Sequence, residues 1–381
     1  MRIKDICSGV TDGSHNPPQG LENSDYLMLS SKNVFDDKIT FDSPRYLSQI
    51  DFEQESKRTR IKSGDVLLTI VGTVGRAAVV GENMPQFTLQ RSVAVLHPNV
   101  EICDSRYLMY ALQANRNHIE SRAKGVAQKG IYLKEVADIE LQIPLLSEQT
   151  HRVKVLDKIA FVIKFHQKQL QKLDELIKAR FVELFGDPIS NPNGWKTEKA
   201  EMYIDLCSGF PFDSSQYTES GVNICGGLII MPQRIEWNDC KHWCSTEGYE
   251  EYTLKKNDIV IALDRPWISE GFKIAMVDTE HLPALLIQRT ARIRAIDINQ
   301  FYLMYCFLLG GFDNHCNVTG SLVPHISAKD IRSFPIMLPP MGLQEQFAAF
   351  VEQVNKSKVA VQKSLDEAQL LFDSLMQQYF G

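Results

Sequence analysis

The side chains of this sequence with the clearest chemical potential are hydrogen-bond donors, cations and aromatic rings on segments rich in glycine and proline. The first half contributes Ser14, His15, Asn16, Thr73, Arg76, Arg91, Gln128, Lys129 and Tyr132. The second half contributes Phe212, Ser214, Ser215, Arg265, Trp267, Ser321 and His325. Such groups read base edges and hold phosphates in duplex DNA. Each one alone could be a solvated surface side chain, but as a set recurring in two halves they predict DNA-binding loops.

Catalytic motifs are missing from the sequence. No glycine-rich loop ends in Gly-Lys-Ser or Gly-Lys-Thr, which argues against a nucleotide motor. Asn16-Pro17-Pro18-Gln19 resembles the Asn-Pro-Pro-aromatic signature of amino-methyltransferases, but Gln19 breaks the pattern and a rigid turn is preferred. Cys240, His242 and Cys244 lack the usual spacing of zinc ligands. We therefore expect no catalytic residue, no metal and no cofactor on this chain.

Composition predicts an ordinary globular protein with at least two domains. The chain has 381 residues, of which 44% are hydrophobic and 23% charged. It contains no apolar run of about 18 residues and no apolar signal-peptide core, so we expect a cytoplasmic protein without a membrane span. Its eight cysteines show no even spacing and fit reduced thiols. The net charge of −6 means that any DNA binding must depend on local basic loops.

Two long helices are predicted to position these loops. A heptad stripe over residues 147–186 consists of Leu156, Ile163, Leu170, Ile177 and Leu184. A second stripe over residues 341–381 consists of Val351, Val354, Val361, Leu365, Phe372, Leu375 and Tyr379, and Lys358 interrupts it as a candidate register marker. Two unrelated amphipathic helices are the alternative. Because both segments end in Phe-Gly and share one register, we favour two helices that pair as a coiled coil.

The segments ahead of the two helices repeat as well. The matched blocks are Ile6-Cys7-Ser8-Gly9 with Leu206-Cys207-Ser208-Gly209, Gln90-Arg91-Ser92 with Gln288-Arg289-Thr290, and Tyr107-Leu108-Met109-Tyr110 with Tyr302-Leu303-Met304-Tyr305. Strand-like and helical blocks match while loops differ, which suits two modules that recognise different targets. The predicted boundaries are a globular domain over 1–146, a helix over 147–186, a domain over 187–340 and a helix over 341–381.

Taken together, these motifs resemble the specificity subunits of type I restriction–modification systems (the HsdS family). The resemblance covers essentially the whole chain. It is carried by Thr11–Asn16, Gly64–Leu68 with Gly75-Arg76, Gln90–Ser92, Gly125–Ile131, Pro144-Leu145 with Glu148-Gln149, and Pro339-Pro340 with Glu345-Gln346. The second copy departs from the pattern at Asp264-Arg265-Pro266-Trp267, where the Gly-x-x-Gly-Arg loop is lost.

The resemblance implies an α+β fold with two tandem target-recognition domains, each followed by a long helix. The two helices would pair as an antiparallel coiled coil with pseudo-two-fold symmetry. Each domain would read one half of a bipartite, asymmetric site on double-stranded DNA. The helices would set the spacing and dock two modification (methyltransferase) subunits, and restriction/translocase subunits would join them. S-adenosylmethionine, ATP and Mg would belong to those partners. A stand-alone DNA-modifying or DNA-cleaving enzyme and a protein-only coiled-coil adaptor are the alternatives.

Overall fold

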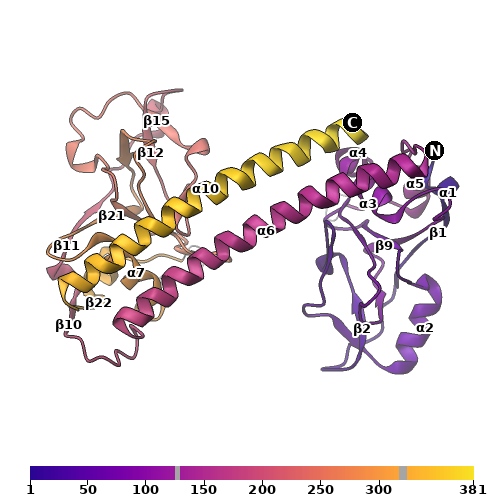
Figure 1. Ribbon diagram of the computed structural model, residues 1–381, viewed down its shortest axis with the longest axis horizontal. Coiled ribbons are helices and arrows are strands. Elements are labelled where there is room, and N and C mark those ends of the chain that lie inside the picture. Colours follow the sequence, from indigo (N-terminus) through magenta and orange to yellow (C-terminus); the bar gives the residue numbers. More distant parts are fainter. Residues whose placement is uncertain (125–128, 317–323) are drawn as a thin grey trace. The chain divides into compact units, whose positions relative to one another are not determined.

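The computed structural model describes residues 1–124, 129–316 and 324–381, and its chain forms two compact units. Unit 1 consists of Met1–Gln167 and Lys363–Gly381, and unit 2 consists of Lys168–Gln362. Both boundaries fall inside the long helices. Each unit therefore combines a globular part with one segment of each helix (Figure 1). The predicted contacts Gln128 and Ser321 lie outside the described residues.

Unit 1 contains two small sheets and a hairpin. The four-stranded antiparallel sheet has the order β1 (Cys7–Asp12), β9 (Val93–Pro98), β6 (Val66–Thr69), β7 (Ala77–Val79). The three-stranded sheet has the order β5 (Arg45–Leu47), β2 (Tyr26–Leu29), β8 (Phe87–Leu89), with β2 and β8 parallel. The hairpin pairs β3 (Val34–Phe35) with β4 (Lys38–Ile39). Its helices are α1 (Ile3–Ile6), α2 (Gln49–Thr59), α3 (Ser105–Ala114), α4 (Arg116–Arg122), α5 (Leu133–Ala137) and the 3-10 turn η1 (Ser31–Asn33).

Unit 2 repeats both sheets and the hairpin of unit 1 in the same strand order. Its four-stranded sheet is β11 (Ile204–Ser208), β21 (Thr290–Ala295), β16 (Ile259–Ala262), β19 (Ile274–Met276), and its three-stranded sheet is β15 (Lys241–Trp243), β12 (Val222–Cys225), β20 (Ala284–Leu286). The hairpin β13 (Ile230–Met231) with β14 (Arg234–Ile235) matches β3–β4. Additional pairs are β17 (Trp267–Ile268) with β18 (Gly271–Phe272) and β10 (Thr197–Lys199) with β22 (Pro335–Met337). The helices are α7 (Gln300–Leu309), α8 (Phe312–His315) and α9 (Ala328–Ser333), and the 3-10 turns are η2 (Ala200–Met202), η3 (Ser214–Gln216), η4 (Trp237–Asp239) and η5 (Glu250–Tyr252). The predicted tandem repeat and α+β class are confirmed.

Backbone pairing corrects the first sequence match between the repeats. The amide of Gly13 donates to the Val93 carbonyl at 3.2 Å, and the amide of Gly209 donates to the Thr290 carbonyl at 3.1 Å. Because β9 and β21 are equivalent strands, the counterpart of Gly209 is Gly13 rather than Gly9. The shared Cys-Ser-Gly letters are therefore out of structural register.

These equivalent glycines let two backbones approach closely. A Cβ on Gly13 would overlap the carbonyl oxygen of Leu89, and one on Gly209 would overlap that of Ile287. Since rigid backbone must then move, we expect Gly13→Ala to lower the stability of unit 1, and Gly209→Ala that of unit 2, each by about 1–3 kcal/mol. Site-resolved hydrogen exchange measures the local stability of each unit through the protection of its backbone amides. Gly342→Ala, which meets nothing within 4 Å, is the matched control; equal protection in all three variants would contradict the expectation.

The long helices are α6 (Leu146–Phe185) and α10 (Met341–Phe380), within one residue of the predicted bounds. In unit 1, Arg152 Nη1 donates to the Tyr379 carbonyl at 2.6 Å, which sets the start of α6 beside the end of α10. In unit 2, Lys358 Nζ lies 2.6 Å from Asp174 Oδ1. The helix segments thus pair antiparallel within each unit. Lys358, which interrupts the apolar stripe of α10, forms an ion pair with Asp174 of α6.

The predicted seam residues differ in burial. Leu156, Ile163, Ile177, Val351 and Val354 are buried, whereas the others, Leu170, Leu184, Val361, Leu365, Phe372, Leu375 and Tyr379, are half-buried. The heptad pattern missed Phe181 and Phe185, which are fully buried. The seam residues are therefore most deeply buried where the long helices meet a globular part, and burial is not uniform along the helices.

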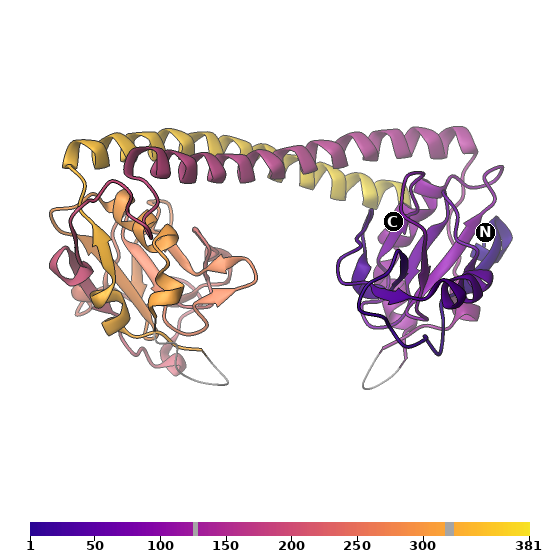
Figure 2. The same ribbon diagram turned by 90° about the horizontal axis from the view of Figure 1, so that it is seen from below.

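Aromatic rings pack the end of each long helix against a globular part. Phe185 of α6 lies 4.7 Å from Tyr302 of α7, and Phe380 of α10 lies 5.1 Å from Tyr107 of α3, measured between ring centroids. The last turn of each long helix thus packs on the globular part of the opposite repeat. This contact explains the phenylalanine in the repeated Phe-Gly ending. Figure 2 shows each globular part on one side of the helix segments that belong to its own unit.

Two buried glutamines fix the start of each long helix in the same way. Gln149 Oε1 accepts from the Asp104 amide at 2.9 Å, and its Nε2 donates to the Pro144 carbonyl at 2.8 Å. Gln344 Oε1 accepts from the Asn299 amide at 2.9 Å and likewise donates to a proline carbonyl. Gln344 is therefore the counterpart of Gln149, which corrects the match of Glu148-Gln149 with Glu345-Gln346.

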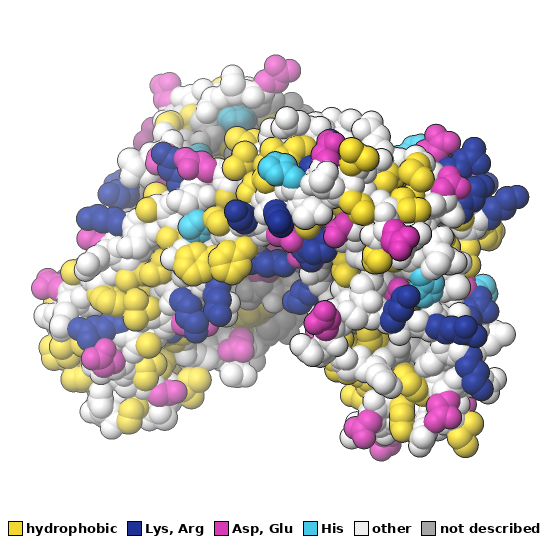
Figure 3. Space-filling view, turned by 45° about the vertical axis from the view of Figure 1, so that its right-hand side comes forward, with side chains coloured by type: hydrophobic (Ala, Val, Ile, Leu, Met, Phe, Trp, Pro, Cys, Tyr) yellow, Lys and Arg dark blue, Asp and Glu magenta, His cyan; other side chains and the backbone are white. Residues whose placement is uncertain are grey.

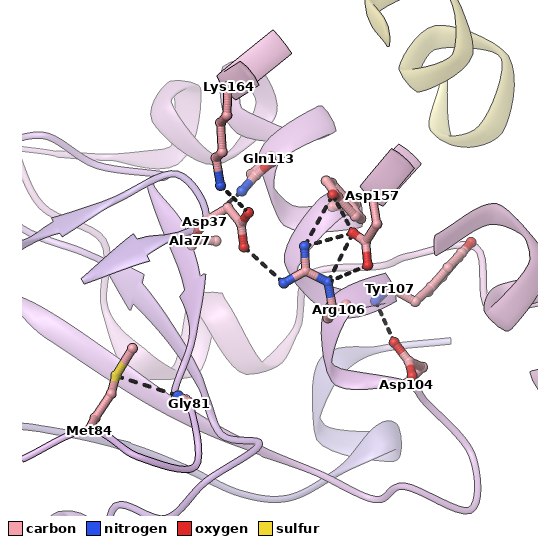
Figure 4. Close-up of polar contacts among 11 residues, drawn as sticks. Asp37, Ala77, Gly81, Met84, Asp104, Arg106, Tyr107, Gln113, Asp157 and Lys164 are labelled. Atoms are coloured by element: carbon pink, nitrogen blue, oxygen red, sulfur yellow. Dashed lines mark hydrogen bonds and ion pairs between the residues drawn. The ribbon is translucent and has the colours of Figure 1, made fainter. Parts of the chain in front are cut away.

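An ion network found in unit 1 holds the β3–β4 hairpin against α6 (Figure 4). Arg106 of α3 contacts Asp157 at 2.6 Å and Asp37 of the hairpin at 2.9 Å, and Lys164 reaches Asp37 at 2.9 Å. Burial opposes ionisation of Asp37, but hydrogen bonds from Arg106 and Lys164 hold its pKa below the ordinary value. In unit 2 the equivalent hairpin residue, Gln233, accepts a hydrogen bond from a tyrosine hydroxyl instead. The hairpin of unit 1 is therefore held by ion pairs to α3 and α6, and that of unit 2 by a neutral hydrogen bond from α7.

Candidate nucleic-acid interface

A groove of about 570 Å³ in unit 1 brings together three of the predicted contacts, His15, Arg91 and Tyr132. Its other lining residues are Asp12, Arg58, Ile70, Val71, Lys124, Gly130, Ile131 and Leu133. Tyr132 is 70% exposed and offers a ring for stacking or packing. With His15 neutral, three cations stand against one carboxylate, so the lining carries a net charge of +2.

Asp12 organises the donors of this groove. It ends β1, is 5% exposed, and accepts from His15 Nε2 at 2.7 Å and Arg58 Nη2 at 2.5 Å. Arg58 Nε also donates to the Asp12 carbonyl at 3.0 Å, which fixes the guanidinium plane twice. A buried carboxylate with two donors is satisfied, and it holds both donors in defined positions at the groove.

The remaining contacts predicted for unit 1 occupy different environments. Ser14 is 5% exposed and acts through its backbone, whose carbonyl accepts from the Arg91 amide, so burial removes its side chain from the groove surface. Asn16, Thr73 and Lys129 are exposed, and none of them lines the groove. Arg76 lies over the Phe35 ring at 5.0 Å, also outside the groove lining.

A second groove, of about 610 Å³, lies in unit 2 and includes the predicted contact Arg265. Its polar lining consists of Lys241, Lys273, Arg289, Gln288, Asp239 and Asp264, and its apolar wall includes Ile224, Leu228, Ile229 and Ile287. Four cations stand against two carboxylates, which again gives a net charge of +2. Leu228 is 92% exposed at the edge of this groove.

Asp264 plays in unit 2 the part that Asp12 plays in unit 1. Its Oδ1 lies 2.8 Å from His325 Nδ1, and its Oδ2 accepts from Arg289 Nη1 at 3.0 Å. By backbone pairing, Asp264 corresponds to Val71, since Asp264 bridges His325 as Val71 bridges Gly130. The two His–Asp–Arg sets therefore stand on different positions of the shared scaffold.

Two aromatic predictions in unit 2 belong to the core. Phe212 is 4% exposed and packs on Trp243 at 4.8 Å, so burial takes it out of the candidate interface. Trp267 is half-buried and stacks on Phe272 at 5.2 Å. Ser214 and Ser215 are exposed in η3, outside the groove lining. A phenylalanine or tryptophan in a loop sequence can be either a core residue or a base-stacking residue, because both roles use an exposed or buried aromatic ring of the same type.

Backbone pairing also corrects the second matched block. The Arg91 amide donates to the Ser14 carbonyl at 2.9 Å, and the Gln288 amide donates to the Phe210 carbonyl at 2.8 Å. Gln288, not Arg289, is therefore the counterpart of Arg91. The shared Gln-Arg letters differ in register by one residue, and the two domains present different side chains at this turn.

Sequence reasoning missed Arg58, Lys273 and Arg289 as groove residues. Lys273 had a detectable signal, because it precedes β19 as Arg76 precedes β7. The Arg76 carbonyl accepts from Thr69, and the Lys273 carbonyl accepts from Ala262, the equivalent strand residue. The inserted β17–β18 hairpin lengthens the loop. The second copy therefore lost the Gly-x-x-Gly-Arg letters but kept a cation at that position.

The charge of the grooves contrasts with that of the whole chain. Each groove lining is net +2, whereas the chain is net −6. On the face drawn in Figure 3, acidic and basic side chains lie beside one another. A polyanion would therefore be attracted to local sites rather than by the overall field.

Other chemistry finds little support in the described parts of the chain. Burial raises the pKa of the Cys7, Cys103, Cys306 and Cys316 thiols to about 12, which disfavours a thiolate nucleophile at these positions. Within residues 1–124, 129–316 and 324–381, no group of three or more His, Cys, Asp or Glu side chains is arranged to hold a metal ion. None of the helices described there is long and apolar enough to cross a membrane.

Comparisons with known proteins agree with this architecture. The MjaVIII type I restriction enzyme specificity subunit of Methanocaldococcus jannaschii is 24% identical over 318 residues, covering 79% of this chain and 74% of that protein. The EcoAI specificity subunit of Escherichia coli is 30% identical over 198 residues, covering 49% of this chain and 33% of that protein.

Solved structures share the fold. A type I restriction–modification S subunit from M. genitalium matches with a TM-score of 0.59 at 14% identity, covering 100% of this chain and 95% of that chain. A chain from a type I restriction–modification assembly matches with a TM-score of 0.52 at 18% identity, covering 100% and 96%. The family model for the type I restriction modification DNA specificity domain matches residues 2–175 and 244–368. The chain belongs to this family of type I restriction–modification DNA specificity proteins.

Proposed function

We propose that this chain is the DNA-recognition subunit of a type I restriction–modification enzyme and has no catalysis of its own. One observation carries the proposal: two grooves of net charge +2, built from different residues, stand on one repeated scaffold in an acidic chain. A repeated scaffold supplies the same kind of platform twice, and different groove side chains supply different base preferences. Each unit then reads one half of a bipartite, asymmetric target on double-stranded DNA.

The contacts that we assign to DNA follow from the geometry of the grooves. In unit 1 they are His15, Arg58, Arg91, Lys124 and Tyr132; in unit 2 they are Arg265, Lys273, Gln288, Arg289 and His325. Asn16, Thr73, Arg76, Lys129, Ser214 and Ser215 remain candidates at the margins of the interface. Asp12 and Asp264 position the donors, as the carboxylates behind binding side chains do in pre-organised sites.

The long helices supply the proposed spacer. Each of α6 and α10 has 40 residues, which at 1.5 Å per residue gives a rod of about 60 Å. We propose that this rod sets the gap between the half-sites. Two modification subunits would dock on the helix-bearing side and bring S-adenosylmethionine, and restriction/translocase subunits would bring ATP and Mg. We propose that the protein acts in the cytoplasm.

The proposal is tested by reconstituting the chain with its modification subunit on a random-sequence DNA pool with S-adenosylmethionine. We expect one bipartite motif to be methylated. Asp12→Asn should relax one half of that motif and Asp264→Asn the other half, because each releases one His and one Arg. His118→Ala, which changes an exposed α4 residue outside both grooves, is the control. Methyl transfer by the chain alone would favour an enzyme, and methylation without any motif would favour a protein-only adaptor.

A further inference from the structure

Lys273 is a buried cation in the groove of unit 2. Its residue is 6% exposed, and its Nζ donates to the carbonyl of Gly227. An ammonium group carries three donors, so one carbonyl leaves its hydrogen-bonding capacity unfilled. Burying a charge costs free energy unless an opposite charge compensates it. The side chain nevertheless lines the groove, where a ligand could reach it.

Two carboxylates line this groove: Asp239 is exposed, and Asp264 is already paired with other side chains. Asp264 binds His325 with one oxygen and Arg289 with the other. Arg265, which is exposed and lines the same groove, adds positive charge instead. Burial lowers the pKa of Lys273, and the positive charge of Arg265 lowers it further. Two cations in one groove that destabilise each other would both be stabilised by an anion between them.

We propose that Lys273 and Arg265 form a seat for one phosphodiester of the DNA backbone. This inference rests on the proposed function. Backbone hydrogen bonds hold both residues: the Lys273 amide donates to the Pro266 carbonyl at 2.8 Å, and the Arg265 amide donates to the Pro324 carbonyl at 2.7 Å. Lysine and arginine both serve as phosphate contacts, which fix the register of a protein on the duplex without reading its sequence. The seat would therefore set where the base-reading side chains of unit 2 fall.

The test uses the complex with modification subunits and duplexes that carry the methylated motif. Lys273→Met should weaken binding roughly tenfold, as expected for the loss of a hydrogen bond to a charged group. It should also reduce the slope of log affinity against log salt by about 0.9, the value of one phosphate. The motif itself should stay unchanged. Lys256→Met removes an equal charge from an exposed turn outside the groove and should leave the slope unaltered.

A neutral methylphosphonate linkage, moved along the duplex one position at a time, locates the phosphate. Wild type should lose affinity at one position near the half-site of unit 2, and Lys273→Met should be insensitive there, because the two changes remove the same contact. If Lys273→Met does not fold, the exposed Arg265→Gln decides by the same two measurements. Lys273→Arg should restore most of the slope.

Three outcomes would overturn the seat. The first is a wild-type salt slope in both Lys273→Met and Arg265→Gln; the second is additive losses at every methylphosphonate position. The third is stabilisation of the complex by millimolar inorganic phosphate at constant ionic strength in the absence of DNA, which would assign the groove to a free anion. Absence of any methylated motif in the wild-type complex would refute the proposed function instead, so the two failures are distinguishable.

Discussion

Removing residues 363–381 should leave unit 1 unable to remain a folded monomer. This segment of α10 packs Phe372, Leu375, Met376, Tyr379 and Phe380 against the core of unit 1. Full burial of a large apolar side chain stabilises a protein by about 1.5–3 kcal/mol. These five side chains are half-buried, so at about half that value each the combined loss still approaches the stability of a whole domain. Unit 2 keeps its own segments of both helices and should keep its unfolding transition.

Light scattering and hydrogen exchange measure this effect. We expect the truncated chain to dimerise or aggregate and to lose amide protection in unit 1 alone. Replacing Leu370 and Leu371 by serine is the control, because these side chains are 72% and 51% exposed and should be dispensable for folding. A monomeric truncated chain with wild-type protection in unit 1 would show that the end of α10 is not needed.

Inserting seven residues into both long helices should change the gap of the DNA target and preserve its half-sites. The unit boundaries lie at 167/168 in α6 and 362/363 in α10, so matched insertions there leave every contact inside the units intact. Seven residues keep the heptad phase, and at 1.5 Å each they add about 10 Å. That length spans at most about three base pairs at 3.4 Å each.

Sequencing of methylated DNA from the reconstituted complex reads this outcome directly. Inserting seven residues into α6 alone makes the paired helices unequal and should lower stability or activity without producing a new defined gap. An unchanged gap in the doubly extended protein would contradict the proposed spacer. Altered half-sites would indicate that the insertion had disturbed the recognition grooves themselves.

The sequence predicted the helices and the repeat because both are periodic. Burial imposes a seven-residue period on a helix seam, and duplicated topology preserves the order of strands. Phe181 and Phe185 escaped the heptad pattern because they follow the surface of the globular part, where Tyr302 sets the contact rather than the partner helix. A heptad pattern cannot predict contacts with a surface that exists only after the globular part has folded.

The grooves were harder to foresee. Asp12 and Arg58 are 46 residues apart, and Asp264 and His325 are 61 apart, so only the fold brings them together. Matching letters also misled the alignment, because Gly9 and Arg289 share residue types with positions that they do not structurally match. The Arg106 network of unit 1 has the same origin, since residues from a hairpin, α3 and α6 meet there.

The exchange of helix ends between the repeats has a consequence for synthesis on the ribosome. Unit 1 consists of two parts of the chain, and the whole of unit 2, Lys168–Gln362, is translated between them. The module that begins first must therefore wait for its closing segment until the other module has emerged. During that interval Tyr107 lacks Phe380, its partner from α10. Chaperone binding to the globular part of unit 1 should accordingly persist until residues 363–381 have left the exit tunnel.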